Sequence, residues 1–519
     1  MSHKGAIAAG HPETVEAARL MLEAGGNAFD AALAALCAAC VTEPVLASLG
    51  GGGFLMAARG RQTRLYDFFA QTPRCRRPLD EVEFYPIVAD FGGTQQEFHI
   101  GLGAMAVPGV LRGLFHVHRE LGSIPMRRLI EPALNLARRG VTVNAFQQYM
   151  LQVTKPIYAS TPENLFVYGS REHAGDLLGE GETFRLPAFA DALESLAIEG
   201  DRLFYEGEMG RALLADARDR GGFLTADDLK HYRVVERQPF SVEYRGARLL
   251  TNPPPSSGGL LIGFALGLLE AADPGHRGFG SPEHLDLLAR TMDLTNQARI
   301  ESDLRDLPVD QQVSALLDPP FLARYRDEVL HRRRANRGTT HISVIDSHGQ
   351  AASLTVSNGE GVGYLVPGTG IMMNNMLGEE DINPHGFNNW PLDSRIASMM
   401  APSVLRWPDG RIAALGSGGS NRIRTAVIQV LVNLLDFGMD LEPAVEAPRI
   451  HHENGFLDAE PGYPEATEHW LTDRFPRHRI WGQRNMFFGG VHSVLLDAAR
   501  SRISGAGDPR RGGRWASAA

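Results

Sequence analysis

The sequence predicts an α+β protein with a large buried core, and three observations support that prediction. Apolar residues recur at helical spacing over 14–23, and the Ala-rich stretch 31–40 has high helix propensity. Polar and apolar residues alternate over 341–345, which is the pattern of a strand with two different faces. The chain has 519 residues, of which 43% are hydrophobic and 22% are charged, as in ordinary globular proteins.

The expected elements follow one another along the chain without an internal repeat or a low-complexity tract. Gly25 and Gly26 end the first helix, and Asp30 is the expected N-cap of the second. The Gly-rich break at 50–53 precedes a strand at 54–58. Further helices are expected at 109–121, 124–139, 186–198, 207–219, 258–272, 281–301, 422–437 and 441–447. Strands dominate from 339 onward, at 341–346, 350–356, 411–416 and 490–496.

The charge balance argues against a nucleic-acid partner. The chain carries 51 basic and 61 acidic residues, for a net charge of −10, and it has no basic stripe. A solvated, partly frayed tail is expected to hold the last arginines: Arg500, Arg502, Arg510, Arg511 and Arg514. No segment approaches the ~18 apolar residues that span a membrane. The N-terminus lacks the successive regions of a secretory signal, so we expect a cytoplasmic protein without a membrane partner.

Cysteine and histidine content argues against a disulfide framework and a metal site. The chain contains three cysteines: Cys37, Cys40 and Cys75. This count is small and odd, and Cys37 and Cys40 are expected to be small core residues of the Ala-rich helix. The run His451-His452-Glu453 resembles a metal cluster, but adjacent strand side chains point to opposite faces and no third ligand is evident. We therefore expect no metal and no other cofactor.

Thr339 stands at the junction of two unlike segments. Residues 318–338 are strongly charged and are expected to form an exposed linker, whereas a strand begins at or near Thr339. Cleavage of the bond between Gly338 and Thr339 would give Thr339 a free α-amine beside its own hydroxyl. That amine has a reference pKa near ~8, so it can serve as the general base for the hydroxyl. An ordinary strand threonine is the alternative interpretation.

Short motifs are spread over nearly the whole chain. They are GGNAFDAA at 25–32, EP at 43–44, SLGGGGF at 48–54, VPG at 107–109, LTADDL at 224–229, PPPSSGG at 253–259, NN at 374–375, APRIHH at 447–452 and GAGDPR at 505–510. In this order they resemble the γ-glutamyltranspeptidase family, a branch of the N-terminal nucleophile hydrolases. The resemblance implies an αββα four-layer sandwich. It also implies one domain built from two fragments, 1–338 and 339–519, because the strand at Thr339 would lie in the middle of a sheet.

The resemblance assigns the reaction chemistry to Thr339 and its neighbours. Thr339 would be the nucleophile, freed when the precursor cuts itself after Gly338. Ser357 takes the place of a family threonine whose hydroxyl supports the nucleophile, although a serine at the start of a loop is the alternative. His341 lies on the same strand face as Thr339 but about 6–7 Å along it, so we interpret it as structural.

A Gly-rich run at 416–421 precedes the helix expected from 422. Backbone N–H groups at such a turn can bind negative charge. In the family this turn forms the oxyanion hole, and here the donors would be Gly419 and Ser420, or Gly418 and Gly419 if the match is shifted by one residue. A phosphate-binding loop is excluded, since no Gly-Lys-Ser/Thr sequence follows.

The substrate-binding positions depart from the family pattern. Phe69 replaces the arginine that clasps a substrate α-carboxylate, and the family's paired serines become Ser398 and Met399. Candidates for binding the α-amine or its surroundings are Glu379, Glu380, Asp381, Asn358 and Glu360. Phe69 and Met399 are expected to make the same pocket wall apolar. Loss of the bidentate clamp predicts an acyl group other than a standard γ-glutamyl, unless Arg395 or Arg422 restores the contact.

The resulting interpretation is an enzyme of the γ-glutamyltransferase and glutathione hydrolase type. It would cut itself before Thr339 and then cleave or transfer the acyl group of a γ-glutamyl-type amide through an acyl-threonine intermediate. Its partners would be a small amide or peptide and the two fragments of its own precursor. The alternatives are an acylase-type amidohydrolase acting on a non-glutamyl amide, and an uncleaved homologue that binds without catalysis.

Overall fold

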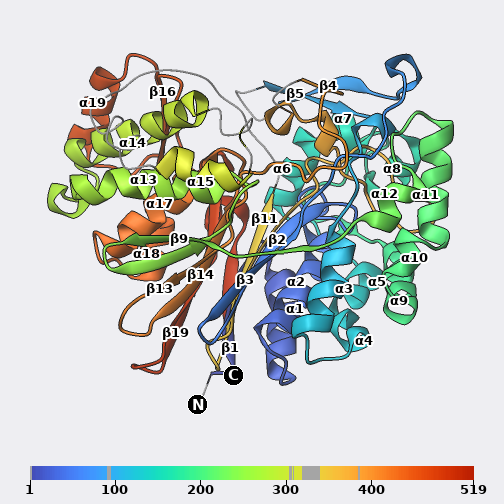
Figure 1. Ribbon diagram of the computed structural model, residues 1–519, viewed down its shortest axis with the longest axis horizontal. Helices are drawn as coiled ribbons and strands as arrows, with labels where there is room; N and C mark the ends of the chain where they lie inside the picture. Colours follow the sequence, from blue (N-terminus) through green and yellow to red (C-terminus); the bar gives the residue numbers. More distant parts are fainter. Residues whose placement is uncertain (1–2, 91–94, 303–306, 308, 318–338, 384–385) are drawn as a thin grey trace.

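The computed structural model describes residues 3–90, 95–302, 307, 309–317, 339–383 and 386–519. Gly338 and the rest of the charged segment 318–338 lie outside these residues. Two large antiparallel sheets dominate the fold (Figure 1). The first contains, in order, β20 (Arg514–Ala518), β1 (Gly5–Ala9), β11 (Thr340–Asp346), β12 (Ala351–Ser357), β2 (Gly52–Arg59), β3 (Gln62–Phe68) and β8 (Val235–Arg237). The second contains β19 (Arg502–Ala506), β18 (Gly490–Asp497), β14 (Ile412–Gly418), β13 (Ser403–Arg406), β10 (Ala247–Thr251) and β9 (Phe240–Tyr244).

The two sheets pack face to face, with β11 and β12 of the first against β14 of the second. Helices α1 (Pro12–Glu23) and α2 (Ala28–Thr42) cover the outer face of the first sheet. Helices α13 (Gly258–Ala272) and α17 (Arg422–Leu435) cover the outer face of the second (Figure 1). The four layers form the αββα sandwich that the resemblance implied. Both sheets draw on residues from before and after Thr339.

The remaining elements surround this sandwich. The other helices are α3 (Val110–Leu121), α4 (Met126–Leu129), α5 (Glu131–Arg139), α6 (Ala145–Val153), α7 (Lys155–Tyr158), α8 (Pro162–Tyr168), α9 (Pro187–Glu199), α10 (Arg202–Tyr205), α11 (Glu208–Asp219), α12 (Ala226–His231), α14 (Pro282–Glu301), α15 (Val309–Leu317), α18 (Leu441–Glu446) and α19 (Glu465–Arg474). The small sheets are β4 (Tyr85–Asp90) with β5 (Gln95–Ile100), β6 (Val141–Thr142) with β7 (Thr183–Phe184), and β15 (Ile450–Glu453) with β16 (Phe456–Ala459) and β17 (His478–Ile480).

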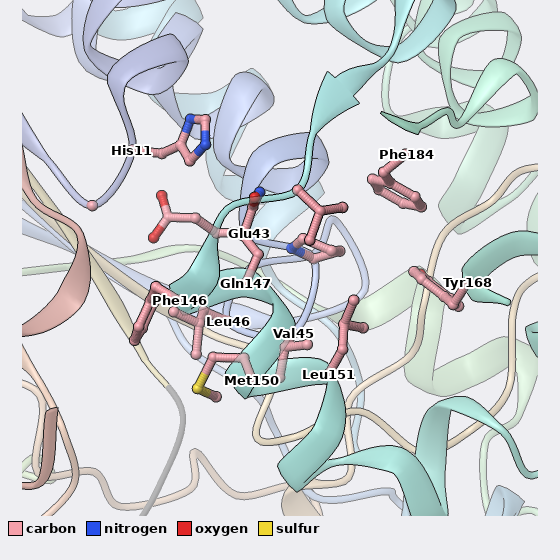
Figure 2. Close-up of a pocket in the computed structure, with 13 residues that line it drawn as sticks. His11, Glu43, Val45, Leu46, Phe146, Gln147, Met150, Leu151, Tyr168 and Phe184 are labelled. Atoms are coloured by element: carbon pink, nitrogen blue, oxygen red, sulfur yellow. The ribbon is translucent and has the colours of Figure 1, made fainter. Parts of the chain in front are cut away.

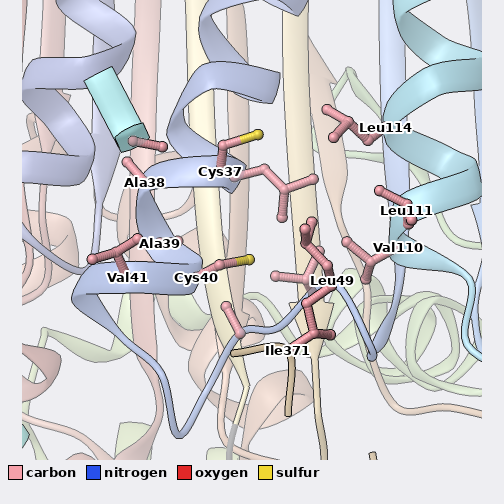
Figure 3. Packing of buried hydrophobic residues seen from close by; sticks show 14 of the residues in the cluster. Cys37, Ala38, Ala39, Cys40, Val41, Leu49, Val110, Leu111, Leu114 and Ile371 are labelled. Carbon is pink, nitrogen blue, oxygen red and sulfur yellow. The ribbon is translucent and has the colours of Figure 1, made fainter. Parts of the chain in front are cut away.

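Successive side chains of β11 point to opposite faces of the first sheet, so this strand contributes to two core clusters. Ile342 and Val344 belong to the core cluster under α1 and α2, whereas Ile345 belongs to the cluster shared with the second sheet. Helix α2 is Ala-rich and wholly buried. Cys37 and Cys40 lie on α2 among apolar side chains (Figure 3), which confirms their prediction as core residues.

Two sequence expectations about capping and the tail need correction. The N-cap of α2 is Asn27, not Asp30: the Asn27 side chain accepts from the Asp30 N–H, and the Asp30 carboxylate accepts from the Asn27 N–H in return. The C-terminal segment is no frayed tail, since β20 pairs with β1. Arg510 and Arg511 are buried, and Arg510 forms ion pairs with acidic partners inside the fold. The other three arginines of that group, at 500, 502 and 514, are exposed as expected.

Candidate active site

Thr339 lies immediately before β11 and only 4% of it is exposed. Its carbonyl oxygen accepts a hydrogen bond from Nη1 of Arg511 at 3.1 Å. A Cβ built on Gly418 would overlap the same carbonyl oxygen, so the main chain of Thr339 rests directly against Gly418. The fold therefore brings the predicted nucleophile and the predicted oxyanion turn into contact, although 79 positions separate Thr339 from Gly418 in the sequence.

The Gly-rich turn after β14 has a left-handed backbone at two successive residues. Gly419 and Ser420 have φ values of +120° and +53°, in the left-handed region that favours glycine. The N–H groups of Arg422 and Ile423 close the turn by donating to the carbonyls of Gly419 and Ser420, both at 3.0 Å. In the described part of the chain, the N–H groups of Gly419 and Ser420 make no hydrogen bond of their own. Such donors can stabilise a developing oxyanion.

Ser357 ends β12 on the strand next to Thr339. The register pairs Thr340 with Val356, so its continuation by one residue sets Ser357 opposite Thr339. The Ser357 hydroxyl accepts a hydrogen bond from the Gly359 N–H at 3.0 Å. This position agrees with a residue that acts beside the nucleophile.

Glu379 and Asn375 converge on Gly359, just past the end of β12, and Asn358 precedes this glycine. A Cβ on Gly359 would overlap side-chain oxygens of both Asn375 and Glu379, which shows that these side chains converge there. Asn358 is fully buried, and its amide has no hydrogen-bond partner among the described residues. Glu379 is buried as well. Glu380, by contrast, is exposed, so of the two predicted glutamates it is Glu379 whose side chain lies against Gly359.

The other predicted binding residues are spread over separate parts of the fold. Phe69 stacks on Phe54 of β2 with ring centroids 5.3 Å apart, in the core between the sheets. Met399 packs in a different cluster beneath α13. The Ser398 hydroxyl accepts from the Met400 N–H at 3.0 Å. Phe69 and Met399 are therefore not members of one apolar cluster. The Asp381 side chain lies outside the described part of the structure.

The arginines that could replace the missing clamp are held in place by protein groups. Arg395 donates to the carbonyl of Phe69, to the hydroxyl of Tyr232 and to the carbonyl of Arg233. Its guanidinium also lies over the Tyr232 ring, 4.7 Å from the centroid. The guanidinium of Arg422 stacks on the Phe487 ring at 4.3 Å. Arg395 is thus a structural cross-link behind Phe69.

His341 and His451 both have structural partners. The ring nitrogens of His341 bond the hydroxyls of Thr355 at 2.7 Å and Ser343 at 2.9 Å. Burial, and to a lesser extent nearby His492, holds the pKa of His341 well below its usual value, which keeps the ring neutral. His451 bonds Thr425 and Glu453. Within the described ranges no three metal-binding side chains come together.

Two buried charged residues beside Thr339 and Thr340, Glu43 and Arg511, were not among the predicted site residues. Glu43 Oε2 accepts a hydrogen bond from the Thr340 hydroxyl at 2.7 Å. Figure 2 shows the Glu43 carboxylate between His11 and Phe146, at the polar end of an otherwise apolar pocket. Arg511, which contacts Thr339, is 3% exposed. The only sequence signals were the EP motif at 43–44 and the GAGDPR motif that ends one residue before Arg511.

Burial shifts the pKa values of both charged groups. Desolvation raises the pKa of Glu43 to about 7, against the opposing effects of the Thr340 hydrogen bond and the charge of Arg511. Desolvation lowers the pKa of Arg511 to about 10, so it remains a cation at neutral pH. The positive charge of Arg511 therefore persists beside Thr339 at neutral pH whatever the protonation state of Glu43.

Glu43 is expected to make the protein less stable as the pH rises. Its folded-state pKa of about 7 lies above the ordinary value of 4.5, so the folded state binds more protons between these pH values. Stability should fall by about 3 kcal/mol across that window and then level off. Urea unfolding of the wild type and Glu43→Gln from pH 4.5 to 8 checks this. Wild-type stability should fall by this amount relative to that of Glu43→Gln, and parallel curves for the two proteins would contradict the assignment.

The fold and the arrangement around Thr339 together indicate a class of protein. Two antiparallel sheets between helical layers, with a threonine at the start of an inner strand beside a Gly-rich turn, characterise the N-terminal nucleophile hydrolases. The family model described as gamma-glutamyltranspeptidase matches residues 14–518. The chain belongs to the γ-glutamyltranspeptidase family and is an enzyme of that type.

Individual relatives cover most of the chain. The Acylase ACY 1 proenzyme of Pseudomonas sp. (strain SE83) is 31% identical over 97% of this chain and 93% of its own length. The glutathione hydrolase proenzyme of Bacillus subtilis (strain 168) is 28% identical over 98% of this chain and 90% of its own. The crystal structure of cephalosporin acylase from Bacillus halodurans has a TM-score of 0.85 at 23% identity, covering 99% of this chain and 96% of that one. This last likeness concerns the fold alone.

Among the described helices, none combines the length and apolar character required to cross a membrane.

Proposed function

We propose that the chain cuts itself between Gly338 and Thr339 and then uses Thr339 to transfer or hydrolyse the acyl group of an amide. The observation that carries this proposal is the contact of the Thr339 carbonyl with Gly418. The next two residues, Gly419 and Ser420, have N–H groups that can donate to a bound oxyanion. Proenzyme relatives give it further support. The products of the cut would be fragments 1–338 and 339–519.

The reaction would proceed in two steps. The α-amine of Thr339 accepts the proton of the Thr339 hydroxyl as Oγ attacks the amide carbonyl. The resulting oxyanion is stabilised by N–H groups of the turn, those of Gly419 and Ser420 or of Gly418 and Gly419. The amine leaving group takes the proton and departs, which leaves an ester on Thr339. Water gives hydrolysis of this ester, and a second amine gives transfer.

A γ-glutamyl-type amide is the acyl donor that the family favours. Glu379 and Asn358 would bind its α-amine, because a buried carboxylate and a buried amide beside Ser357 can accept from an ammonium group. The glutathione hydrolase relatives support this assignment. Acidic recognition of the amine does not require a partner for the α-carboxylate.

An acylase-type reaction on a non-glutamyl amide is the second candidate. Phe69 stacks within the core where the family has its carboxylate clamp, and Arg395 is engaged with Phe69, Tyr232 and Arg233. The acylase relative from Pseudomonas agrees with such chemistry. Enzyme-type family membership leaves the third possibility, a binding homologue without catalysis, unsupported.

A series of three p-nitroanilides separates the two candidates. We expect the 4-aminobutanoyl compound, which lacks the α-carboxylate, to have a kcat/KM within about threefold of that of the γ-glutamyl compound, since a lost clamp contributes nothing. The glutaryl compound, which lacks the α-amine, should react at least about tenfold more slowly if Glu379 binds the amine. A glutaryl compound as good as the others would favour the acylase reading. A strong preference for the α-carboxylate would contradict the loss of the clamp.

A further inference from the structure

Thr339 lies at the edge of its sheet, just before the strand pairing begins. The ladder between β11 and β12 begins with Thr340 and Val356, so Thr339 lies one residue outside it. After the proposed cleavage this residue would also be a chain end, and chain ends fray unless other groups hold them. A nucleophile must remain within about 0.5 Å of its productive position, so the contacts that hold this residue from outside the ladder matter for the reaction.

Arg511 holds Thr339, the first residue after the proposed cut, from the side of the glycine turn. Its Nη1 donates to the Thr339 carbonyl at 3.1 Å. Its two Nη atoms lie 3.1 Å from the positions that Cβ atoms on Gly418 and Gly419 would occupy. A Cβ on Gly490 would overlap the aliphatic part of the same side chain. Three glycines therefore leave the space in which the Arg511 guanidinium joins Thr339 to the turn.

Glu43 holds Thr340, the second residue after the proposed cut, from the other side of the sheet. Successive residues point to opposite faces, so the Thr340 side chain faces the helical layer, where it donates to Glu43 at 2.7 Å. Glu43 follows α2 directly, and the Thr14 hydroxyl lies 3.5 Å from its other carboxylate oxygen. A Cβ on Gly10 would overlap the carboxylate, so this place is also built around the charge. Glu43, the partner of Thr340, also lines the pocket shown in Figure 2.

We propose that Arg511 and Glu43 are a pair of positioning residues that keep the new N-terminus, Thr339 and Thr340, fixed against the glycine turn. This inference rests on the proposed function and deepens it. Arg511 acts through the main chain of Thr339 and Glu43 acts through the side chain of Thr340. Neither residue is assigned a contact with substrate, so their loss should affect the rate of the chemical step and leave binding nearly unchanged.

The test compares steady-state kinetics of cleaved wild type with Arg511→Met, Arg511→Lys, Thr340→Val and Thr340→Ser, using the best substrate of the p-nitroanilide series. Arg511→Met and Thr340→Val should each lower kcat by at least about tenfold with KM within about twofold of wild type, because misplacement slows the reaction step. Arg511→Lys and Thr340→Ser, which keep a donor, should recover much of the loss. Arg514→Gln is the matched control. Arg514 is exposed at the start of β20, three residues after Arg511, so this variant should behave as wild type.

Denaturing gels run beforehand separate this inference from the proposed function. Wild type that is not cleaved overturns the proposed function itself. Cleaved wild type together with Arg511→Met and Thr340→Val variants of unchanged kcat overturns only the positioning pair, as does a rise in KM at constant kcat. If Arg511→Met fails to fold, Thr340→Val decides the matter, since valine matches threonine in size and removes only the hydroxyl.

Discussion

Replacement of Thr339 with alanine is expected to leave one uncleaved chain and to lower amide turnover by roughly 10⁴-fold or more. The substitution removes the hydroxyl that would attack both the peptide bond after Gly338 and the substrate carbonyl. It leaves the main-chain contacts of Thr339 with Arg511 and Gly418 in place, so the fold should be preserved. Turnover of γ-glutamyl-p-nitroanilide, measured beside a denaturing gel and a thermal melt, checks all three expectations.

The matched control is Thr339→Ser, which keeps a hydroxyl next to an α-amine. It should still cut itself and retain measurable activity. If the alanine variant is cleaved or turns over amides as fast as wild type, Thr339 is not the nucleophile. If the serine variant is as inactive as the alanine variant while folding normally, the hydroxyl alone does not explain the effect.

Gly418→Ala is expected to have the second-largest effect. The added Cβ would overlap the carbonyl carbon and oxygen of Thr339, which are main-chain atoms that cannot move without shifting β11. Displacement of the nucleophile from the turn should lower kcat by roughly 10²- to 10³-fold, similar to the loss of an oxyanion donor. Kinetics and gel analysis of the purified variant measure the loss and show whether cleavage also slows.

Gly482→Ala provides the control for this substitution, because a Cβ at that position meets no heavy atom within 4 Å. It should match wild type in kcat, cleavage and stability. Wild-type kinetics in Gly418→Ala would show that the close contact between Thr339 and the turn is not needed for the reaction.

Local patterns in the sequence were sufficient to predict most of the secondary structure. Helix α13 occupies the predicted 258–272, and β11 and β12 begin within one residue of the expected positions. Helical spacing and strand alternation are local properties, so one sequence carries them. The stacking of the sheets came from the family resemblance instead, because pairing such as β1 with β11 joins segments far apart in the chain.

The parts of the site that sequence reasoning missed depend on long-range contacts. Glu43 and Thr340 are 297 positions apart, and Arg511 and Thr339 are 172 apart. A tail rich in arginine resembles a solvated segment until its buried partners, Glu460 and Asp508, are placed around it. Charge composition alone could not distinguish these cases, because the acidic partner of Arg510 at Glu460 comes from a distant part of the chain.

The Asp30 error has a local cause. Both Asn27 and Asp30 are residues that cap helices, and they stand three positions apart. The structure uses both, with Asn27 as the cap and Asp30 as its reciprocal partner. Phe69 shows a different limit. Comparison with the family motif shows that an arginine is missing at this position, but only the fold reveals that the phenyl ring stacks on Phe54 in the core.

Intact-mass and N-terminal sequence analysis of the purified wild-type protein shows directly whether cleavage makes Thr339 a chain end. We expect two polypeptides, 1–338 and 339–519, with the smaller one beginning Thr339-Thr340-His341. An active protein that remains a single chain, or whose smaller fragment begins at any other residue, would contradict this expectation.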